Sequence, residues 1–322
     1  MNYKNVLPTL ALPVVLIMLV SCTTVERTSV NPSPLQSLGV STATIQEDLG
    51  MQVQRHLRER YNDVRENCGS NSQPAFLCNG ILIRATAPNP TYHVWENSGA
   101  SIRKGGVSFS YLRKDLRYRN FVFGYSSGYI FTAYNFVPAK RRPEILCFFP
   151  IEAATDNRGS KGCGVYSYQG TSFPGSQPCH LSGITTGDQW WAHFTSSPAQ
   201  RSFRQCGFDV SDGRNNLAGP AFSTGMEGQR IMLAKSHMGY NEFILAAWGP
   251  GLGKSLPLEA FFYLYGSDQG LKDAKRNQLD LKNTDGVVIP IISVRLSRTL
   301  TDPATFYYVP ADQAVAMPPA RP

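Results

Sequence analysis

Apolar residues recur at helical spacing over residues 45–66, where the pattern is Ile45, Leu49, Val53, Leu57, Tyr61 and Val64. A spacing of three to four residues places these side chains on one face and predicts an amphipathic helix. Thr44 and Glu47 have the spacing of a capping box, which predicts that the helix begins next to Thr44.

Strand patterns dominate residues 78–151. Apolar, β-branched and aromatic runs over 80–86, 105–113 and 144–151 are typical of strands. Two aromatic segments on either side of residues 126–128 predict a hairpin.

Helical patterns return in the second half of the chain, at residues 185–194, 215–235 and 240–248. A charged segment follows at 268–282, and the run GVVIPIISVRL at 286–296 is typical of a strand. Because strands and helices do not alternate regularly, the α+β class is favoured. We expect a single large domain over residues 45–310, with an antiparallel or mixed sheet and segregated helices.

The two ends of the chain have their own patterns. Residues 1–21 carry an apolar run that ends in LVSC, with a small residue before Cys22, which is typical of a bacterial lipoprotein signal. An ordinary secretory signal and a membrane anchor helix are the alternatives, although the run is short for a membrane span. Residues 22–44 predict a flexible tether and residues 311–322 a disordered tail. We therefore expect an exported protein, either held in the envelope, at the outer membrane, by a lipid on Cys22 or secreted.

Cysteine usage agrees with export. With Cys22 assigned to the lipid, six cysteines remain, and an oxidising compartment favours disulfides. The sequence does not distinguish among the pairings that six cysteines allow. We take the local set as the hypothesis: Cys68 with Cys78, Cys147 with Cys163, and Cys179 with Cys206. A metal site would need spacings such as Cys-x-x-Cys, which the sequence lacks, so no metal is expected.

The chain has a formal net charge of +8, with basic clusters at residues 103–104, 113–119 and 140–142. Such clusters are typical of solvated surface, and beside aromatic residues they can also attract anionic lipid or a phosphorylated small molecule. An exported protein is not expected to bind nucleic acid.

A buried charge stands out in the run GILIRAT, because Arg84 lies inside an otherwise apolar strand pattern. An arginine in such a place needs a carboxylate, a set of carbonyl groups or an anionic ligand. The common nucleotide-loop, serine-hydrolase and zinc-protease motifs are missing from the sequence.

The segments LIRATAPNP (82–90) and GGVSFSYL (105–112) resemble the opening of the ADP-ribosylating exotoxins. In that family an arginine on the first strand contacts the phosphates or ribose of NAD, and a later strand carries Ser-Thr-Ser. The resemblance implies that Arg84, Ser108 and Ser110 contact NAD, with Phe109 where the family has threonine.

The mature chain is also similar to the halovibrins, exported bacterial proteins described as NAD glycohydrolases or ADP-ribosyltransferases. The similarity rests on segments spread over residues 72–264: SQPAFLCNGILIRAT, YHVW, GGVSFSYLR, TDNR, CGFDV, NNLAGPAF and LPLEAFFYL. It implies an NAD-cleaving enzyme that uses NAD as a substrate rather than a cofactor, with an acceptor protein as a further partner if the reaction is transfer.

Cleavage of NAD needs a carboxylate near the ribose, because a positive charge develops on the sugar as nicotinamide leaves. Glu259 is the first candidate because it lies in the apolar run LPLEAFFYL, and Glu152 is the second. A structural pair of Glu259 with Arg84 or Lys254 is the alternative.

In the exotoxins the carboxylate follows a Glu or Gln two positions earlier, a residue associated with the choice of acceptor protein. No glutamate in this chain has that partner, which favours hydrolysis over transfer. His93 and Trp95 could stack on nicotinamide or adenine, and the alternative is that they are core residues.

A second function class is a non-catalytic envelope lipoprotein that binds glycan, lipopolysaccharide or peptidoglycan through a basic aromatic face. The placement of Arg84 distinguishes the two. Catalysis is favoured if Arg84, Ser108 or Ser110, and a glutamate surround one cleft, whereas binding is favoured if Arg84 pairs with a carboxylate far from any cleft.

Overall fold

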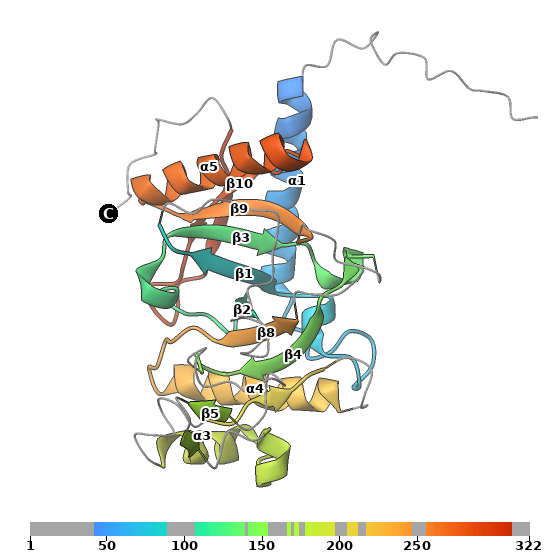
Figure 1. Ribbon diagram of the computed structural model, residues 1–322. Coiled ribbons are helices and arrows are strands. Elements are labelled where there is room, and N and C mark those ends of the chain that lie inside the picture. Colours follow the sequence, from blue (N-terminus) through green and yellow to red (C-terminus); the bar gives the residue numbers. More distant parts are fainter. Residues whose placement is uncertain are drawn as a thin grey trace, which may run out of the picture. The chain divides into compact units, whose positions relative to one another are not determined.

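The computed structural model describes residues 42–88, 107–138, 141–153, 166–168, 171–173, 178–196, 205–211, 217–246 and 256–310. These residues belong to one compact unit, Ser41–Pro322. Within it, a mostly antiparallel sheet of nine strands is combined with helices, which confirms the α+β class (Figure 1).

The strands follow the order β11-β10-β9-β3-β1-β2-β8-β4-β7, in which β9 and β10 are parallel. Their bounds are β1 (Ile81–Thr86), β2 (Val107–Leu112), β3 (Ser127–Phe131), β4 (Glu144–Phe149), β7 (Phe208–Asp209), β8 (Glu242–Ala246), β9 (Leu258–Leu264), β10 (Ile291–Arg295) and β11 (Thr305–Tyr308). A separate pair is formed by β5 (Tyr166–Tyr168) and β6 (Thr171–Phe173). The described helices are α1 (Thr42–Asn62), α3 (Gly187–Thr195), α4 (Ala218–Ala234) and α5 (Asp268–Asp285), with short 3-10 turns η1 (Ala75–Leu77), η2 (Val122–Gly124), η3 (Tyr134–Phe136) and η6 (Cys179–Ser182).

The helices gather over the two ends of the sheet (Figure 1). At one end α1 contacts β11, β10 and β1, and α5 contacts β9, β3 and β10. At the other end α4 contacts β7 and β4, and α3 packs on α4. The apolar clusters follow this division, since the largest includes Trp190 and Phe222 from α3 and α4, whereas a second includes Leu57 of α1. The middle strands β1, β2 and β8 connect the two ends.

Several predicted elements are confirmed. The strand patterns around β1, β2, β4 and β10 form strands, and the helical patterns around α3 and α4 form helices, while the charged segment at 268–282 lies in the further helix α5. Helix α3 begins with a capping box, because the Thr186 side chain accepts from the backbone of Gln189 and the Gln189 side chain accepts from the backbone of Thr186.

Helix α1 begins and ends earlier than predicted, at Thr42 and Asn62 instead of residues 45 and 66. The end has a local cause. The Asp63 carboxylate accepts hydrogen bonds from the backbone N–H and the side chain of Arg65. This side-chain turn offers the backbone an alternative to another helical turn.

The helix predicted over residues 240–248 is wrong, because this segment forms the strand β8. It lies between β2 and β4, and Phe243, Ile244 and Leu245 are fully buried. A short run that is apolar on both faces fits a buried strand as well as a buried helix, so its periodicity does not separate the two.

The predicted aromatic hairpin around residues 126–128 is also wrong. Its first half forms the turn η2, and β3 pairs with β1 and β9 instead. Gly128 permits the pairing with β1, because a β-carbon at this position would collide with the carbonyl oxygen of Arg84.

Two of the expected disulfides are present, Cys68–Cys78 and Cys179–Cys206. Cys147 is disulfide-bonded as well, and its expected partner Cys163 lies outside the described residues. The disulfides indicate an extracytoplasmic protein. In the described part of the chain, no helix combines the length and the apolar character needed to cross a membrane.

Other expectations concern segments that the structure does not describe. The signal at 1–21, Cys22 and its lipid, the tether up to residue 41 and the tail at 311–322 lie outside the described residues. The same holds for His93 and Trp95.

Candidate functional site

A pocket of about 390 Å³ opens where β1 and β2 diverge. The two strands pair over Ile81–Ile83 and Ser110–Leu112. Beyond this ladder β1 continues along β3, whereas β2 pairs with β8 through Val107–Phe109. The opening between them has a volume typical of sites for small molecules.

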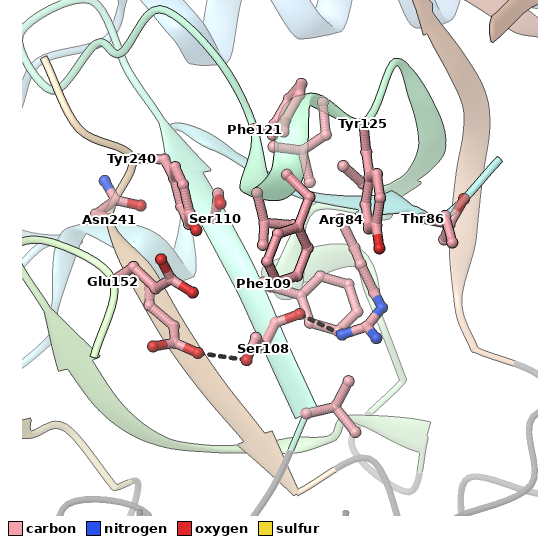
Figure 2. Close-up of a pocket in the computed structure, with 17 residues that line it drawn as sticks. Arg84, Thr86, Ser108, Phe109, Ser110, Phe121, Tyr125, Glu152, Tyr240 and Asn241 are labelled. Atoms are coloured by element: carbon pink, nitrogen blue, oxygen red, sulfur yellow. Dashed lines mark hydrogen bonds between the residues drawn. The ribbon is translucent and has the colours of Figure 1, made fainter. Parts of the chain in front are cut away.

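Arg84 is the first residue of β1 beyond this ladder, and it lines the pocket. Its Nη1 donates a hydrogen bond of 2.6 Å to the backbone carbonyl of Ser108, and its guanidinium carbon lies 5.8 Å from the centre of the Phe109 ring. Figure 2 shows the guanidinium beside Ser108 and Phe109. Because β1 and β2 separate at this point, Arg84 can both donate to a carbonyl of β2 and line the pocket.

Glu242, at the start of β8, lines the same pocket. The hydroxyl of Ser108 donates to Oε1 of Glu242, and the backbone N–H of Ala153 donates to Oε2 at 2.9 Å. Only 2% of Glu242 is exposed, so these donors compensate a charge that burial would otherwise disfavour. Ser108 thus contacts Arg84 through its carbonyl group and Glu242 through its hydroxyl.

The position of Glu242 relative to β2 depends on its neighbour Asn241. The side chain of Asn241 accepts a hydrogen bond from the backbone N–H of Tyr111 at 2.7 Å and donates to the carbonyl of Tyr111 at 2.8 Å. It also donates to Gln229 of α4. This fully buried amide holds the start of β8 against β2 where the ladder with β1 begins.

A second carboxylate in the pocket belongs to Glu152, which follows β4. The Glu152 backbone N–H donates to the carbonyl of Tyr240 at 3.0 Å, and Figure 2 shows the Glu152 side chain beside the Tyr240 hydroxyl. Burial and the neighbouring carboxylates of Glu152 and Glu242 raise the pKa of Tyr240. The phenol therefore stays protonated beside the Glu152 carboxylate.

Aromatic side chains from η2 and its surroundings form another part of the pocket lining. Phe121, Phe123 and Tyr125 all line it, and Phe123 is 84% exposed with the left-handed φ of 51°. The rings of Phe123 and Tyr125 lie 5.5 Å apart. An exposed phenylalanine in this backbone conformation is uncommon.

Glu259, the carboxylate first expected at the ribose, is placed elsewhere. It lies on β9 and forms an ion pair with Arg60 of α1. Burial raises the pKa of Glu259 in spite of the opposing effect of Arg60. The partner is thus neither Arg84 nor Lys254, and Glu259 is not among the residues that line the pocket of Arg84.

The basic cluster at 113–119 is only partly a solvated surface. Arg113 is fully buried and pairs with Asp115 at 2.7 Å, and Arg230 of α4 donates to the other oxygen of Asp115 at 2.8 Å. Burial disfavours the ionised carboxyl, yet these two cations hold the pKa of Asp115 below its usual range. This cluster therefore connects β2 to α4 instead of offering all its charge to a partner.

The structure brings together Arg84, Ser108 and Ser110 of the predicted site with Glu152, and adds Glu242, which sequence reasoning missed. The argument that selected Glu259, a glutamate in an apolar run, applies equally to Glu242 at the start of FILAA. Glu242 was missed because residues 240–248 were predicted to form a helix. Among the described residues, no group of three or more His, Cys, Asp or Glu side chains could hold a metal ion. Neither the models of known protein families nor the curated proteins include a match to this chain.

Proposed function

We propose that this protein cleaves NAD between nicotinamide and ribose, with Glu242 at the ribose and Arg84 at the phosphates. One observation carries the proposal. An arginine on β1, two serines on β2 and a glutamate on the later strand β8 line a single pocket. This is the set of groups that the resemblance to the exotoxins implies, with the carboxylate moved from Glu259 to Glu242.

The chemistry of NAD explains why these groups would suffice. Nicotinamide is already cationic in NAD and leaves as a neutral ring, so the leaving group needs no proton from an acid. The developing positive charge on the ribose is what the site must stabilise, and a preoriented carboxylate does so. Glu242 is held from both sides by Ser108 and the N–H of Ala153, which fixes its orientation.

Arg84 would supply the complementary charge for the diphosphate. A guanidinium keeps its proton at every relevant pH and matches the oxygens of a phosphate. Its bond is to the carbonyl of Ser108, the same residue whose hydroxyl contacts Glu242. Arg84 would therefore bind the anionic diphosphate while Glu242 stabilises the positive charge that develops on the ribose.

The alternative of a non-catalytic envelope lipoprotein required Arg84 to pair with a carboxylate far from any cleft. Arg84 instead lines the pocket with Ser108, Ser110 and two glutamates. This placement supports catalysis over the binding alternative.

Hydrolysis is the favoured form of the reaction. Glu242 has Tyr240 two positions before it, where the exotoxins have the Glu or Gln associated with the choice of acceptor. We therefore expect water to be the acceptor in the absence of a partner protein.

The test is the release of nicotinamide and ADP-ribose from NAD by the purified full chain with its disulfides formed. Glu242→Gln should lower turnover by about 10³-fold, because a preoriented group that acts on transition-state charge is worth this much. Glu259→Gln, corrected for the folded fraction, and Glu144→Gln at the exposed end of β4 should retain turnover. Lack of turnover by the folded parent, with protein acceptors also tried, would refute the function. Full activity of a folded Glu242→Gln would refute the site.

A further inference from the structure

The pocket holds two glutamates, and the ribose carboxylate accounts for one of them. Glu152 and Glu242 reach the pocket from different strand ends, β4 and β8. The same short segment connects them, since the backbone of Glu152 bonds to Tyr240 while the backbone of Ala153 bonds to Glu242. The two carboxylates therefore line the same pocket, and different hydrogen bonds hold the two residues.

Further contacts hold Glu152 in place. The Gln205 side chain donates to the carbonyl of Glu152 at 2.6 Å, and Gln205 is 97% buried next to the disulfide of Cys206 with Cys179. Tyr240 also lines the pocket, and its hydroxyl lies beside the Glu152 carboxylate (Figure 2). Figure 2 shows the side chains of Glu152 and Tyr240 on the same wall of the pocket, with Ser110 nearby. A carboxylate on a solvated loop would need none of these supports.

We propose that Glu152 is the catalytic base that activates the attacking water, with Tyr240 as the positioning residue that holds its carboxylate. This inference rests on the proposed cleavage of NAD and assigns its second step. Tyr240 stands where the exotoxins have the residue associated with the acceptor, and in this fold its carbonyl accepts from the backbone of Glu152. The segment after β4 would thus supply the group that acts on the acceptor.

The step balances without an oxidant or a reductant. The bond between ribose C1′ and the nicotinamide nitrogen breaks, and its electron pair leaves with nicotinamide, which becomes neutral. The oxygen of water supplies the pair for the new bond to C1′. The proton lost by that water passes to the Glu152 carboxylate and then to solvent, which leaves ADP-ribose. The carboxylate of Glu242 takes no part in this proton transfer and stabilises the sugar cation.

A nucleophile that has no proton to lose can distinguish a general-base role of Glu152 from a structural role. Azide adds to the sugar without losing a proton, so it does not need a base. With the full oxidised chain, Glu152→Ala should release nicotinamide about 10²-fold more slowly than the parent, as expected for loss of a general base. Azide should then raise the turnover of Glu152→Ala several-fold and give ADP-ribosyl azide as the product. Glu242→Gln should not respond to azide, because it lacks the group that stabilises the cation.

Tyr240→Phe provides a second variant that keeps the ring and removes only the hydroxyl. Tyr240→Phe should lower nicotinamide release several-fold. Because Tyr240 acts only through Glu152, the double variant Tyr240→Phe and Glu152→Ala should be no slower than Glu152→Ala alone. Glu144→Gln is the control at the exposed start of β4, the strand that precedes Glu152, and it should behave as the parent.

The outcomes separate this inference from the function on which it rests. A parent that releases no nicotinamide refutes the proposed function. A parent that turns over while folded Glu152→Ala is equally fast refutes only the role of Glu152. A slow Glu152→Ala that azide does not rescue also refutes it, since the loss then concerns the pocket structure and not a base.

Discussion

Glu242 and Glu259 both lie on strands of one sheet, yet their surroundings differ in the way that matters for chemistry. Glu259 meets a full counter-charge, Arg60, across the contact between α1 and β9. Glu242 is held by a hydroxyl and a backbone N–H, and its surroundings form part of a pocket. An ion pair holds a carboxylate against a counter-charge, whereas a hydroxyl and a backbone N–H orient the carboxylate that lines the pocket.

The two arginines show the same difference. Arg60 is 9% exposed and matched by Glu259, so it contributes to the attachment of α1. Arg84 donates to a carbonyl group and lines the pocket. A charged side chain within the fold can therefore join two elements, as Arg60 does, or line a pocket, as Arg84 does.

The largest expected effect concerns the structural pair. Arg60→Leu should lower the free energy of unfolding at neutral pH by about 3–5 kcal/mol, because the buried Glu259 carboxylate would lose the paired cation that offsets its burial. Turnover per folded molecule should not change. Urea unfolding with the matched double variant Arg60→Leu and Glu259→Leu tests the cause, since the double variant should recover much of the loss. If the double variant is as unstable as the single one, packing and not charge explains the effect.

The next effect concerns Arg84. Arg84→Lys should reduce nicotinamide release by about 10²-fold, because lysine lacks the planar fork that contacts both a carbonyl and a phosphate. Arg58 is the matched control, since it also donates to a backbone carbonyl, that of Phe306, and lies 5.2 Å from the centre of the Tyr307 ring. Arg58→Lys should retain the parent rate, and equal losses in both variants would contradict the special role of Arg84.

A smaller effect is the pH dependence that Glu259 contributes. Burial raises the pKa of Glu259 above its ordinary value of 4.5, so the folded state binds this proton more tightly than the unfolded chain. The stabilisation from this group is therefore complete below the ordinary pKa and is lost as the pH rises through the folded-state pKa. Unfolding in urea from about pH 4 to about pH 7 should show this decline in the parent, and Glu259→Gln should lack it. If the parent instead gains stability relative to Glu259→Gln as the pH rises, the pKa of Glu259 is lowered in the folded state and the prediction is wrong.

The smallest expected effect lies at the rim of the pocket. Phe123→Asn should raise the free energy of unfolding by about 1 kcal/mol, because asparagine adopts the left-handed conformation more readily than phenylalanine. Little core packing is lost, since the ring is 84% exposed. Phe136 is the control, because it is 70% exposed without a positive φ, and Phe136→Asn should bring no gain in a thermal unfolding comparison.

Much of the fold could be predicted because its signals are local. The strand patterns of β1, β2 and β4 and the helical patterns of α3 and α4 appear as separate periodic runs. The cysteine pairs Cys68–Cys78 and Cys179–Cys206 join residues close in the sequence. The run that forms β8 gave the wrong element because residues buried on both faces lose the alternation that identifies a strand.

By itself, the sequence determined that Arg84 lies in a buried strand, that two serines follow on another strand, and that the class is α+β. It also showed that a glutamate in an apolar run is unusual, which is a local property. Only the tertiary structure decided which glutamates share a pocket with Arg84, because β2 pairs with β8 across more than a hundred residues of sequence. Pairing in a sheet is non-local, so Glu242 joins the pocket and Glu259 joins α1 through the order of the strands.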